Sequence, residues 1–250
     1  MSGKVMLVTG GGRGIGAATC RLAAEQGWAV AINYVADKAP AEALAEEIRL
    51  NNGKALAVQG DVAFLEDVER LFEQTERAFG PVTAVINNAG ITGKSSRLDA
   101  AAPETITKTI AINVTGAIFV AREAVKRMST RNGGAGGVIV NLSSGAATLG
   151  SPGEYTWYAA SKGAIDSFTI GLGREVAEEG IRVVAVAPGL TETEIHARST
   201  GEPGRVQRMT PAIPMKRAGS AEEVANAVMY MVSEQASYIT ATTLRVSGGR

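Results

Sequence analysis

Tyr158 and Lys162, four residues apart in this sequence, are two side chains that could exchange a proton. Residues at this spacing share one face of a helix and lie within interaction distance. A phenol is a poor base at neutral pH, but a neighbouring ammonium favours the phenolate and lowers the tyrosine pKa. The pair therefore predicts an acid/base centre in which Tyr158 exchanges a proton with a substrate oxygen. Alone it is weak evidence, because such a pair also arises by chance.

A glycine-rich turn follows the first apolar run of the chain, residues 5–8, and precedes a helical run. Glycine lets the backbone bend sharply and approach a ligand closely, and the free N–H groups at a helix start favour a pyrophosphate. The turn therefore predicts a dinucleotide site that includes Gly10, Gly14, Ile15 and Gly16. Its spacing differs from G-x-G-x-x-G, so a purely structural turn remains the alternative.

The end of the second apolar run favours NADP over NAD. Asn33 and Tyr34 stand where a carboxylate would bind the ribose hydroxyls and repel a 2′-phosphate, and Asp37 follows in the loop. Arg13, inside the glycine-rich turn, could form a forked pair with a phosphate. We therefore expect Arg13, Asn33 and Tyr34 to contact NADP. In the alternative interpretation, Arg13 is solvated and Asp37 caps the next helix.

Two further polar positions stand out. Ser144 ends an apolar run, where parallel α/β folds assemble ligand sites. Its hydroxyl could hydrogen-bond a reacting carbonyl, but serines at strand ends are also common caps. Asn113 interrupts an otherwise apolar helical stretch, so its amide is satisfied either by backbone or within a polar network.

Short apolar runs alternate with helical stretches along the whole chain. Such runs indicate strands buried on both faces of a parallel sheet, with helices packed on both sides. The expected strands are residues 5–8, 29–32, 55–58, 82–86, 138–142, 183–186 and 244–246. The fold class is therefore α/β, with one doubly wound domain over residues 1–250.

Two long helices are expected, over residues 103–130 and 158–179, the second ending near Gly180. An apolar stripe on the first is expected to face the sheet: Ile106, Ile110, Val114, Ile118, Ala121 and Val125. The irregular segment 190–215 is expected to form a lid over the substrate. Its three arginines, Arg198, Arg205 and Arg208, could attract an anion, but we expect them and His196 to be ordinary solvated loop residues.

Composition excludes several classes of function. Lys plus Arg number 25 and balance 25 Asp plus Glu, so no net positive charge favours nucleic acid or an anionic membrane. A single cysteine, Cys20, and a single histidine, His196, argue against a metal site. Neither a signal-peptide core nor a run of 18 apolar residues occurs. We expect a cytoplasmic protein with a small-molecule substrate.

Several motifs occur together along the chain. With x for any residue, they are Thr9-Gly10-x-x-x-Gly14-Ile15-Gly16, Asp61-Val62, Asn87-Asn88-Ala89-Gly90, Asn113, Ser144, Tyr158-x-x-x-Lys162 and Pro188-Gly189-x-x-x-Thr193. Together they resemble the short-chain dehydrogenase/reductase family over essentially the whole chain. Within that family the sequence is similar to NADP-preferring 3-oxoacyl-carrier-protein reductases and to glucose 1-dehydrogenases. The resemblance implies a Rossmann-type fold and, as in the family's tetramers, a homo-oligomer.

The resemblance also implies functions for individual residues. The catalytic set would be Asn113, Ser144, Tyr158 and Lys162, with Tyr158 as the acid or base, Lys162 holding the nicotinamide ribose, Ser144 orienting the substrate oxygen and Asn113 holding a water. Because Ser144 precedes Tyr158 by 14 residues where 13 is commoner, Ser143 remains an alternative to it. Coenzyme contacts are implied at Asp61, Val62, Asn88, Ala89, Gly90, Tyr158, Lys162, Pro188, Gly189, Thr191 and Thr193.

These inferences predict reversible hydride transfer between NADP(H) and a carbonyl or secondary alcohol. Two alternatives stay open. One is a non-catalytic NADP(H)-binding regulator or redox sensor of the same fold. The other is an isomerase or dehydratase that uses the bound nicotinamide transiently.

Overall fold

A seven-stranded parallel sheet spans the protein in the computed structural model, which describes residues 3–193 and 204–250. The strand order is β3-β2-β1-β4-β5-β6-β7. The strands are β1 (Val5–Val8), β2 (Ala29–Tyr34), β3 (Lys54–Gln59), β4 (Ala84–Asn87), β5 (Gly137–Leu142), β6 (Ile181–Pro188) and β7 (Thr242–Val246). All seven expected strands are present, and the expectation of a doubly wound Rossmann-type fold is confirmed.

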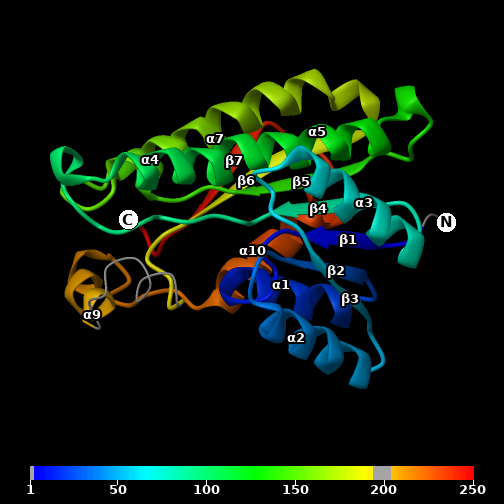
Figure 1. The fold of residues 1–250 in the computed structure, drawn as a ribbon, viewed down its shortest axis with the longest axis horizontal. Coiled ribbons are helices and arrows are strands. Elements are labelled where there is room, and N and C mark those ends of the chain that lie inside the picture. The colour runs from blue at the N-terminus through cyan, green and yellow to red at the C-terminus, as the bar shows by residue number, and fades with distance from the viewer. Residues whose placement is uncertain (1–2, 194–203) are drawn as a thin grey trace.

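Helices cover both faces of the sheet (Figure 1). On one face lie α1 (Gly14–Glu25), α2 (Lys38–Leu50) and α10 (Ala221–Val232), and on the other lie α3 (Leu65–Phe79), α5 (Ala117–Met128) and α7 (Thr156–Glu175). Shorter helices are α4 (Pro103–Ile110), α6 (Ala146–Leu149) and α9 (Arg205–Met209). In Figure 1, α9 lies at the end of the molecule opposite the N-terminus.

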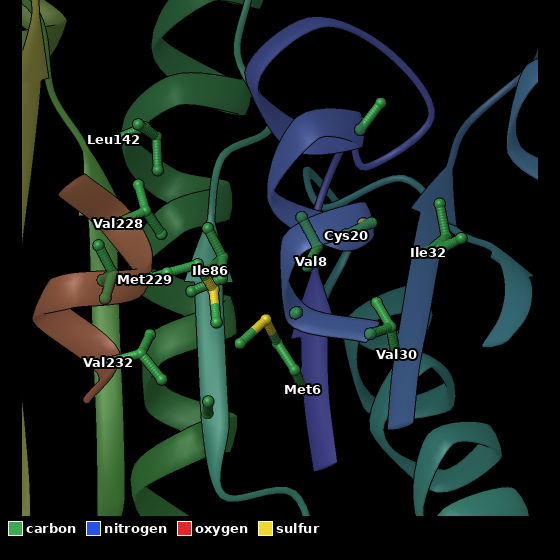
Figure 2. Close-up of a cluster of buried hydrophobic side chains, with 14 of the residues drawn as sticks. Met6, Val8, Cys20, Val30, Ile32, Ile86, Leu142, Val228, Met229 and Val232 are labelled. Carbon is green, nitrogen blue, oxygen red and sulfur yellow. The ribbon is translucent and has the colours of Figure 1, made fainter. Parts of the chain in front are cut away.

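Side chains alternate along the strands and so build two cores. In β1, Met6 and Val8 join the core beneath α1, α2 and α10, whereas Val5 and Leu7 join the core beneath α3 and α5. Figure 2 shows part of the first core, in which Met6 and Val8 lie between neighbouring strands and helices. Because both faces are covered, the strands contain the continuous apolar runs that identified them in the sequence.

The expected continuous helix over residues 103–130 is wrong in one respect. A π-helical turn, Ala111–Gly116, separates α4 from α5. The expected apolar stripe does not face the sheet as a whole, since Ile110 and Ile118 are 37% and 38% exposed. Much of the buried face instead carries small or polar residues, namely Thr109, Asn113, Gly116, Ala117, Ala121 and Ala124, together with the apolar Val120 and Met128.

The second long helix ends where the sequence indicated. α7 gives way to a short 3₁₀ turn, Ala177–Glu179, and Gly180 follows with a φ of 72°. This left-handed conformation suits glycine, which has no Cβ to clash.

The order of the strands reverses between β1 and β4. Successive crossovers run in one direction from β1 to β3 and in the other from β4 to β7. In open α/β sheets, ligands bind in the crevice beyond the carboxyl ends of the strands at this reversal. In the parts of the chain that the structure describes, no helix combines the length and apolarity needed to span a bilayer.

Candidate active site

A large cleft opens at the carboxyl edge of the sheet, with a volume of about 1350 Å³. Ligand sites commonly occupy roughly 300 to 1,000 Å³, so this cleft has room for a dinucleotide and a second, smaller molecule. Its walls come from the loops after β1, β2, β4, β5 and β6, from α7 and from α9. Segments far apart in the sequence therefore meet at one place.

The glycine-rich turn is fixed against the end of β4 by a small hydrogen-bond network. The Thr9 hydroxyl oxygen accepts from the backbone N–H groups of Asn88 and Ala89 at 3.0 and 2.9 Å. The Asn88 side-chain amide in turn donates to the carbonyls of Thr9 and Gly10 at 2.9 and 3.0 Å. Thr9 belongs to the sequence motif but was not predicted as a site residue. It holds the turn against β4 through these hydrogen bonds, which only the folded structure shows.

Glycine is required at two positions of this turn. Gly10 has a φ of 59°, and a Cβ there would lie 3.1 Å from the Ala89 Cα. A Cβ on Gly16 would lie 2.7 Å from both the Gly10 carbonyl oxygen and the Asn88 amide nitrogen. The backbone therefore passes closer to β4 than any residue with a side chain allows.

The start of α1 meets the needs of a phosphate. The N-cap residue of α1, Arg13, makes no side-chain capping hydrogen bond, so the first N–H groups of the helix keep their usual capacity to bind an anion. Gly14 has a φ of 51°, and Thr193 lies across from it, because a Cβ on Gly14 would contact the Thr193 methyl group at 3.4 Å. Bare backbone, helix dipole and cleft size all fit a dinucleotide.

At the end of β2, Arg13 and Asp37 form an ion pair on the wall of the cleft. Asp37 occupies the N-cap position of α2 but makes no side-chain capping hydrogen bond. Asn33 is fully buried, with its Oδ1 accepting from the Gly10 N–H at 3.1 Å and its Nδ2 donating to the Gly60 carbonyl at 2.8 Å. Asn33 therefore supports the turn from below, and Tyr34 is half-buried beside it on the cleft wall.

Tyr158, Lys162 and Ser144 meet on the opposite wall. The Lys162 ammonium lies 5.8 Å from the centre of the Tyr158 ring and donates a 2.6 Å hydrogen bond to the Leu142 carbonyl. Ser144 lies close enough to the Tyr158 phenol to act on its pKa, whereas the Ser143 hydroxyl donates to the Lys162 carbonyl at 3.3 Å. Of the two candidate serines, the geometry brings Ser144 to the phenol.

The pKa values of this pair differ from the sequence expectation. Burial raises the pKa of Tyr158, and the hydrogen bond with Ser144 and the charge of Arg205 offset only part of that rise. The expectation of a lowered tyrosine pKa is therefore wrong, because desolvation by burial dominates. Burial also lowers the pKa of Lys162 to about 8, with Asp166 opposing that shift.

Asn113 lies in the π-helical turn behind this wall and belongs to a polar network. Its Nδ2 donates to the Ile91 carbonyl at 2.8 Å and to the Ser161 hydroxyl at 3.0 Å, and its Oδ1 accepts from the Ile91 N–H at 2.8 Å. The Ser161 hydroxyl donates to the Tyr158 carbonyl at 2.7 Å. Isolated π turns are frequent at functional sites, and this one joins the loop after β4 to the helix of Tyr158.

Most of the predicted site residues lie on the cleft wall. They are Gly10, Arg13, Gly14, Ile15, Asn33, Tyr34, Asn88, Ala89, Gly90, Ser144, Tyr158, Lys162, Pro188, Gly189, Thr191 and Thr193. Four are not among the lining residues, namely Gly16, Asp61, Val62 and Asn113. Gly16 and Asn113 support the wall from behind. Val62 is buried beneath Gly116, and the Asp61 carboxylate accepts from the Ala63 N–H at 3.0 Å.

Arg205 corrects a further expectation. It was expected to be solvated, but it is 4% exposed and forms a forked ion pair with Glu154 within the cleft. No sequence pattern links residues 51 positions apart, so this pair could not be found in advance. His196 and Arg198, and residues 194–203 of the predicted lid, lie outside the described residues. Within residues 3–193 and 204–250, no group of three or more potential ligands is arranged to hold a metal ion.

Comparison with known proteins gives strong matches along the whole chain. A family model described as enoyl-(acyl carrier protein) reductase matches residues 10–250. The chain is 48% identical over 246 residues to the uncharacterized oxidoreductase YgfF of Escherichia coli (strain K12), covering 98% of this chain and 99% of that protein. It is 36% identical over 249 residues to glucose 1-dehydrogenase 2 of Bacillus subtilis (strain 168), covering 100% and 95%.

Solved structures share the fold closely. The crystal structure of 3-ketoacyl-(acyl-carrier-protein) reductase from Brucella melitensis complexed with NADH superposes with a TM-score of 0.90 at 34% identity, covering 100% of this chain and 98% of that one. A short-chain dehydrogenase from Burkholderia cenocepacia in complex with NADP gives a TM-score of 0.90 at 30% identity, with the same coverage. The two coenzymes in these structures differ, so likeness alone does not select one.

Proposed function

Since the chain belongs to the short-chain dehydrogenase/reductase family and is an oxidoreductase, we propose that it transfers a hydride between NADP(H) and a carbonyl or secondary alcohol. The observation that carries this proposal is that Tyr158, Ser144 and Lys162 line the same cleft as the glycine-rich turn. Consumption of NADPH against a panel of carbonyl compounds tests it. A non-catalytic regulator is not favoured, because one cleft holds the full set of groups that proton transfer needs.

In this mechanism the four residues of the catalytic set have different functions. When bound, the nicotinamide supplies the hydride to the carbonyl carbon in reduction and accepts it in oxidation. The Ser144 hydroxyl holds the substrate oxygen, and Tyr158 donates a proton to that oxygen. The buried Lys162 ammonium stabilises the phenolate that remains and holds the nicotinamide ribose. Asn113 fixes the loop after β4 and, through Ser161, the backbone of Tyr158.

The ion pair between Arg13 and Asp37 supports NADP as the preferred coenzyme. The Arg13 guanidinium lies beside the cleft at the end of β2. There, a forked contact with the 2′-phosphate of NADP would replace the ion pair with Asp37. A hydrogen bond to a charged group contributes about 1.5 to 3 kcal/mol. We therefore expect Arg13→Ala to raise the Kd of NADPH about tenfold or more and to leave the Kd of NADH within about twofold.

Asp37→Ala is the matched variant, because it removes the other partner of the same pair. It is expected to tighten NADPH binding and not NADH binding, since a competing carboxylate is gone. Fluorescence titration with each coenzyme measures both variants. Equal changes for NADPH and NADH in either variant would contradict the assignment of this pair to the 2′ position.

The pH dependence of carbonyl reduction follows from the two perturbed groups. The raised pKa of Tyr158 keeps its phenol protonated, and so able to donate, through neutral pH. The pKa of Lys162, lowered to about 8, means that the ammonium is lost as the pH rises through that value. We therefore expect kcat/KM for reduction to be level below about pH 7 and to fall above about pH 8, approaching about tenfold per pH unit.

The variant Lys162→Arg checks this assignment, because a guanidinium stays charged at every accessible pH. Its residual reductase activity is expected to lack the decline near pH 8. If kcat/KM of that variant still falls near pH 8, a group other than Lys162 causes the decline.

We also propose how the protein assembles, where it acts and which segment covers its substrate. Ile110, Ile118 and Ile170 are partly exposed on α4, α5 and α7, and these helices lie together on one side of the sheet (Figure 1). They support a homotetramer, which light scattering would measure. We propose that the protein acts in the cytoplasm on a small molecule, and that residues 190–215 cover the bound substrate. The residues of this segment that lie on the cleft wall support that placement, namely Leu190, Thr191, Thr193, Arg205, Arg208 and Met209.

A further inference from the structure

Arg205, Glu154 and Tyr155 form a tight cluster at the end of the cleft that contains Tyr158. Arg205 Nη2 donates to one Glu154 carboxylate oxygen at 2.6 Å, and Nε donates to the other at 3.2 Å. The same guanidinium donates to the Tyr155 hydroxyl, and its carbon lies 5.5 Å from the centre of the Tyr155 ring. Arg205 begins α9, so the cluster joins α9 to the segment before α7.

Tyr155 connects this cluster to Tyr158. The two rings meet edge to face, with centroids 5.5 Å apart and planes at 88°. Tyr155 is the N-cap residue of α7, and its carbonyl accepts from the Tyr158 N–H at 3.0 Å. No side-chain hydrogen bond caps α7 at this residue. Arg205 therefore contacts the start of the helix that bears Tyr158 and Lys162, beside the hydrogen bond from the Trp157 side chain to the Thr92 carbonyl at 2.8 Å.

We propose that Arg205 is a positioning residue for proton transfer, and that its forked pair with Glu154 and its contact with Tyr155 fix the start of α7 and so the place of Tyr158 in the cleft. The proposal rests on the function proposed above. Arg205 is separated from Tyr158 by Tyr155, so it acts through the Tyr155 ring and the helix start. A guanidinium supplies two parallel donors in one plane, which fixes direction as well as distance.

The electrostatics of the cluster agree with this geometry. Although burial opposes it, the pair with Arg205 holds the pKa of Glu154 below its usual value, so the carboxylate stays ionised. Arg208 lies 4.0 Å from Glu154 and adds a second cation at the edge of the pair. Among the described residues, Lys162, Tyr155 and Arg205 act on Tyr158, and Glu154 and Arg208 act on the Arg205 end of the cluster. Arg205 acts on Tyr158 by its charge as well as by its contacts.

Arg205→Gln, Arg205→Lys and Glu154→Gln test the proposal in the full-length protein. Displacement of a reacting group by about 1 Å can lower a rate about 100-fold. We expect kcat for reduction to fall about 10- to 100-fold in all three variants, with the Kd of NADPH within about twofold. The double variant Arg205→Gln/Glu154→Gln should lose no more than Arg205→Gln alone, because Glu154 acts on Tyr155 through Arg205.

A second measurement needs no substrate. Ionisation of Tyr158 is followed as the phenolate absorbance of each protein minus that of the same protein carrying Tyr158→Phe. Arg205→Gln is expected to move this ionisation to higher pH, whereas Arg205→Lys retains the charge and is expected to stay near the parent protein. A purely structural ion pair would lower thermal stability without this shift. If Arg205→Gln fails to fold, Arg205→Lys and Glu154→Gln still carry the kcat test.

Arg21→Gln is the matched control, because it breaks an exposed forked pair with Glu47 between α1 and α2. It should change neither kcat nor the ionisation of Tyr158. The proposal is overturned if Arg205→Gln keeps kcat within twofold and leaves the ionisation unchanged, if the losses in the double variant add, or if Arg21→Gln loses as much. A parent protein that transfers no hydride overturns the proposed function instead.

Discussion

Tyr158→Phe is expected to lower kcat for carbonyl reduction by about 10² to 10⁴ and to leave the Kd of NADPH within about twofold. The phenylalanine keeps the ring and its edge-to-face contact with Tyr155 but removes the hydroxyl that is proposed to donate the proton. Because the variant leaves the glycine-rich turn and Arg13 unchanged, we expect the coenzyme to lose little affinity. Steady-state kinetics and coenzyme titration measure the two quantities.

A matched control is Tyr238→Phe, since Tyr238 is fully exposed and remote from the cleft lining. It removes the same hydroxyl group and should change neither quantity. If Tyr158→Phe retains full kcat, Tyr158 is not the proton donor. If NADPH binding is lost together with kcat, the variant has damaged the cleft, and the kinetic result no longer identifies an acid.

Gly16→Ala is expected to raise the Kd of NADPH about 5- to 150-fold. The added Cβ would lie 2.7 Å from the Gly10 carbonyl oxygen and from the Asn88 amide nitrogen, and backbone cannot move aside cheaply. Overpacking of this kind costs about 1 to 3 kcal/mol, which corresponds to that range of affinity when the strain falls on the binding turn. Coenzyme titration and thermal unfolding measure the change.

The control is Gly171→Ala in α7, where an added Cβ meets nothing within 4 Å. In a helix interior alanine is favoured over glycine by about 0.5 to 1 kcal/mol, so this variant should bind NADPH normally and unfold at a slightly higher temperature. An unchanged Kd for Gly16→Ala would show that the turn can relax away from Asn88 without cost to binding. The proposed dependence of the coenzyme site on that contact would then be wrong.

The strands of the sheet were predictable because burial on both faces requires nearly continuous apolar residues. Runs such as 5–8 and 183–186 are apolar throughout, as central parallel strands require. Boundaries were less accurate: the strand expected over 82–86 is β4, Ala84–Asn87. Its last residue is a buried amide whose Nδ2 donates to the Ala117 carbonyl at 2.8 Å, a partner that lies 30 residues away.

The face of the helix around Asn113 could not be predicted from hydrophobicity. Thr109, Asn113 and Gly116 are buried there although none is a large apolar residue. Gly116 permits close approach to Val62, since a Cβ would lie 2.8 Å from a Val62 methyl carbon. Because the inner face is chosen for fit and polar contacts, the larger apolar residues Ile110 and Ile118 mark the outer face instead.

Most of the candidate site was predictable because its groups belong to short motifs at strand ends. The Tyr158 and Lys162 spacing and the glycine-rich turn are local, and the parallel sheet brings them to one edge. The net direction of the Tyr158 pKa shift was not predictable, since it depends on how deeply the folded structure buries the phenol. The pair of Arg205 and Glu154 depends on tertiary structure and left no pattern.

The most direct test of the central claim follows one hydride. NADPH that carries deuterium at the transferred position is incubated with the protein and a panel of carbonyl compounds, and the alcohols are analysed by mass spectrometry. The account predicts one deuterium on the former carbonyl carbon for each NADPH oxidised, and loss of that transfer in Tyr158→Phe. Binding of NADPH without deuterium in any product, or conversion of substrate without oxidation of NADPH, would contradict it.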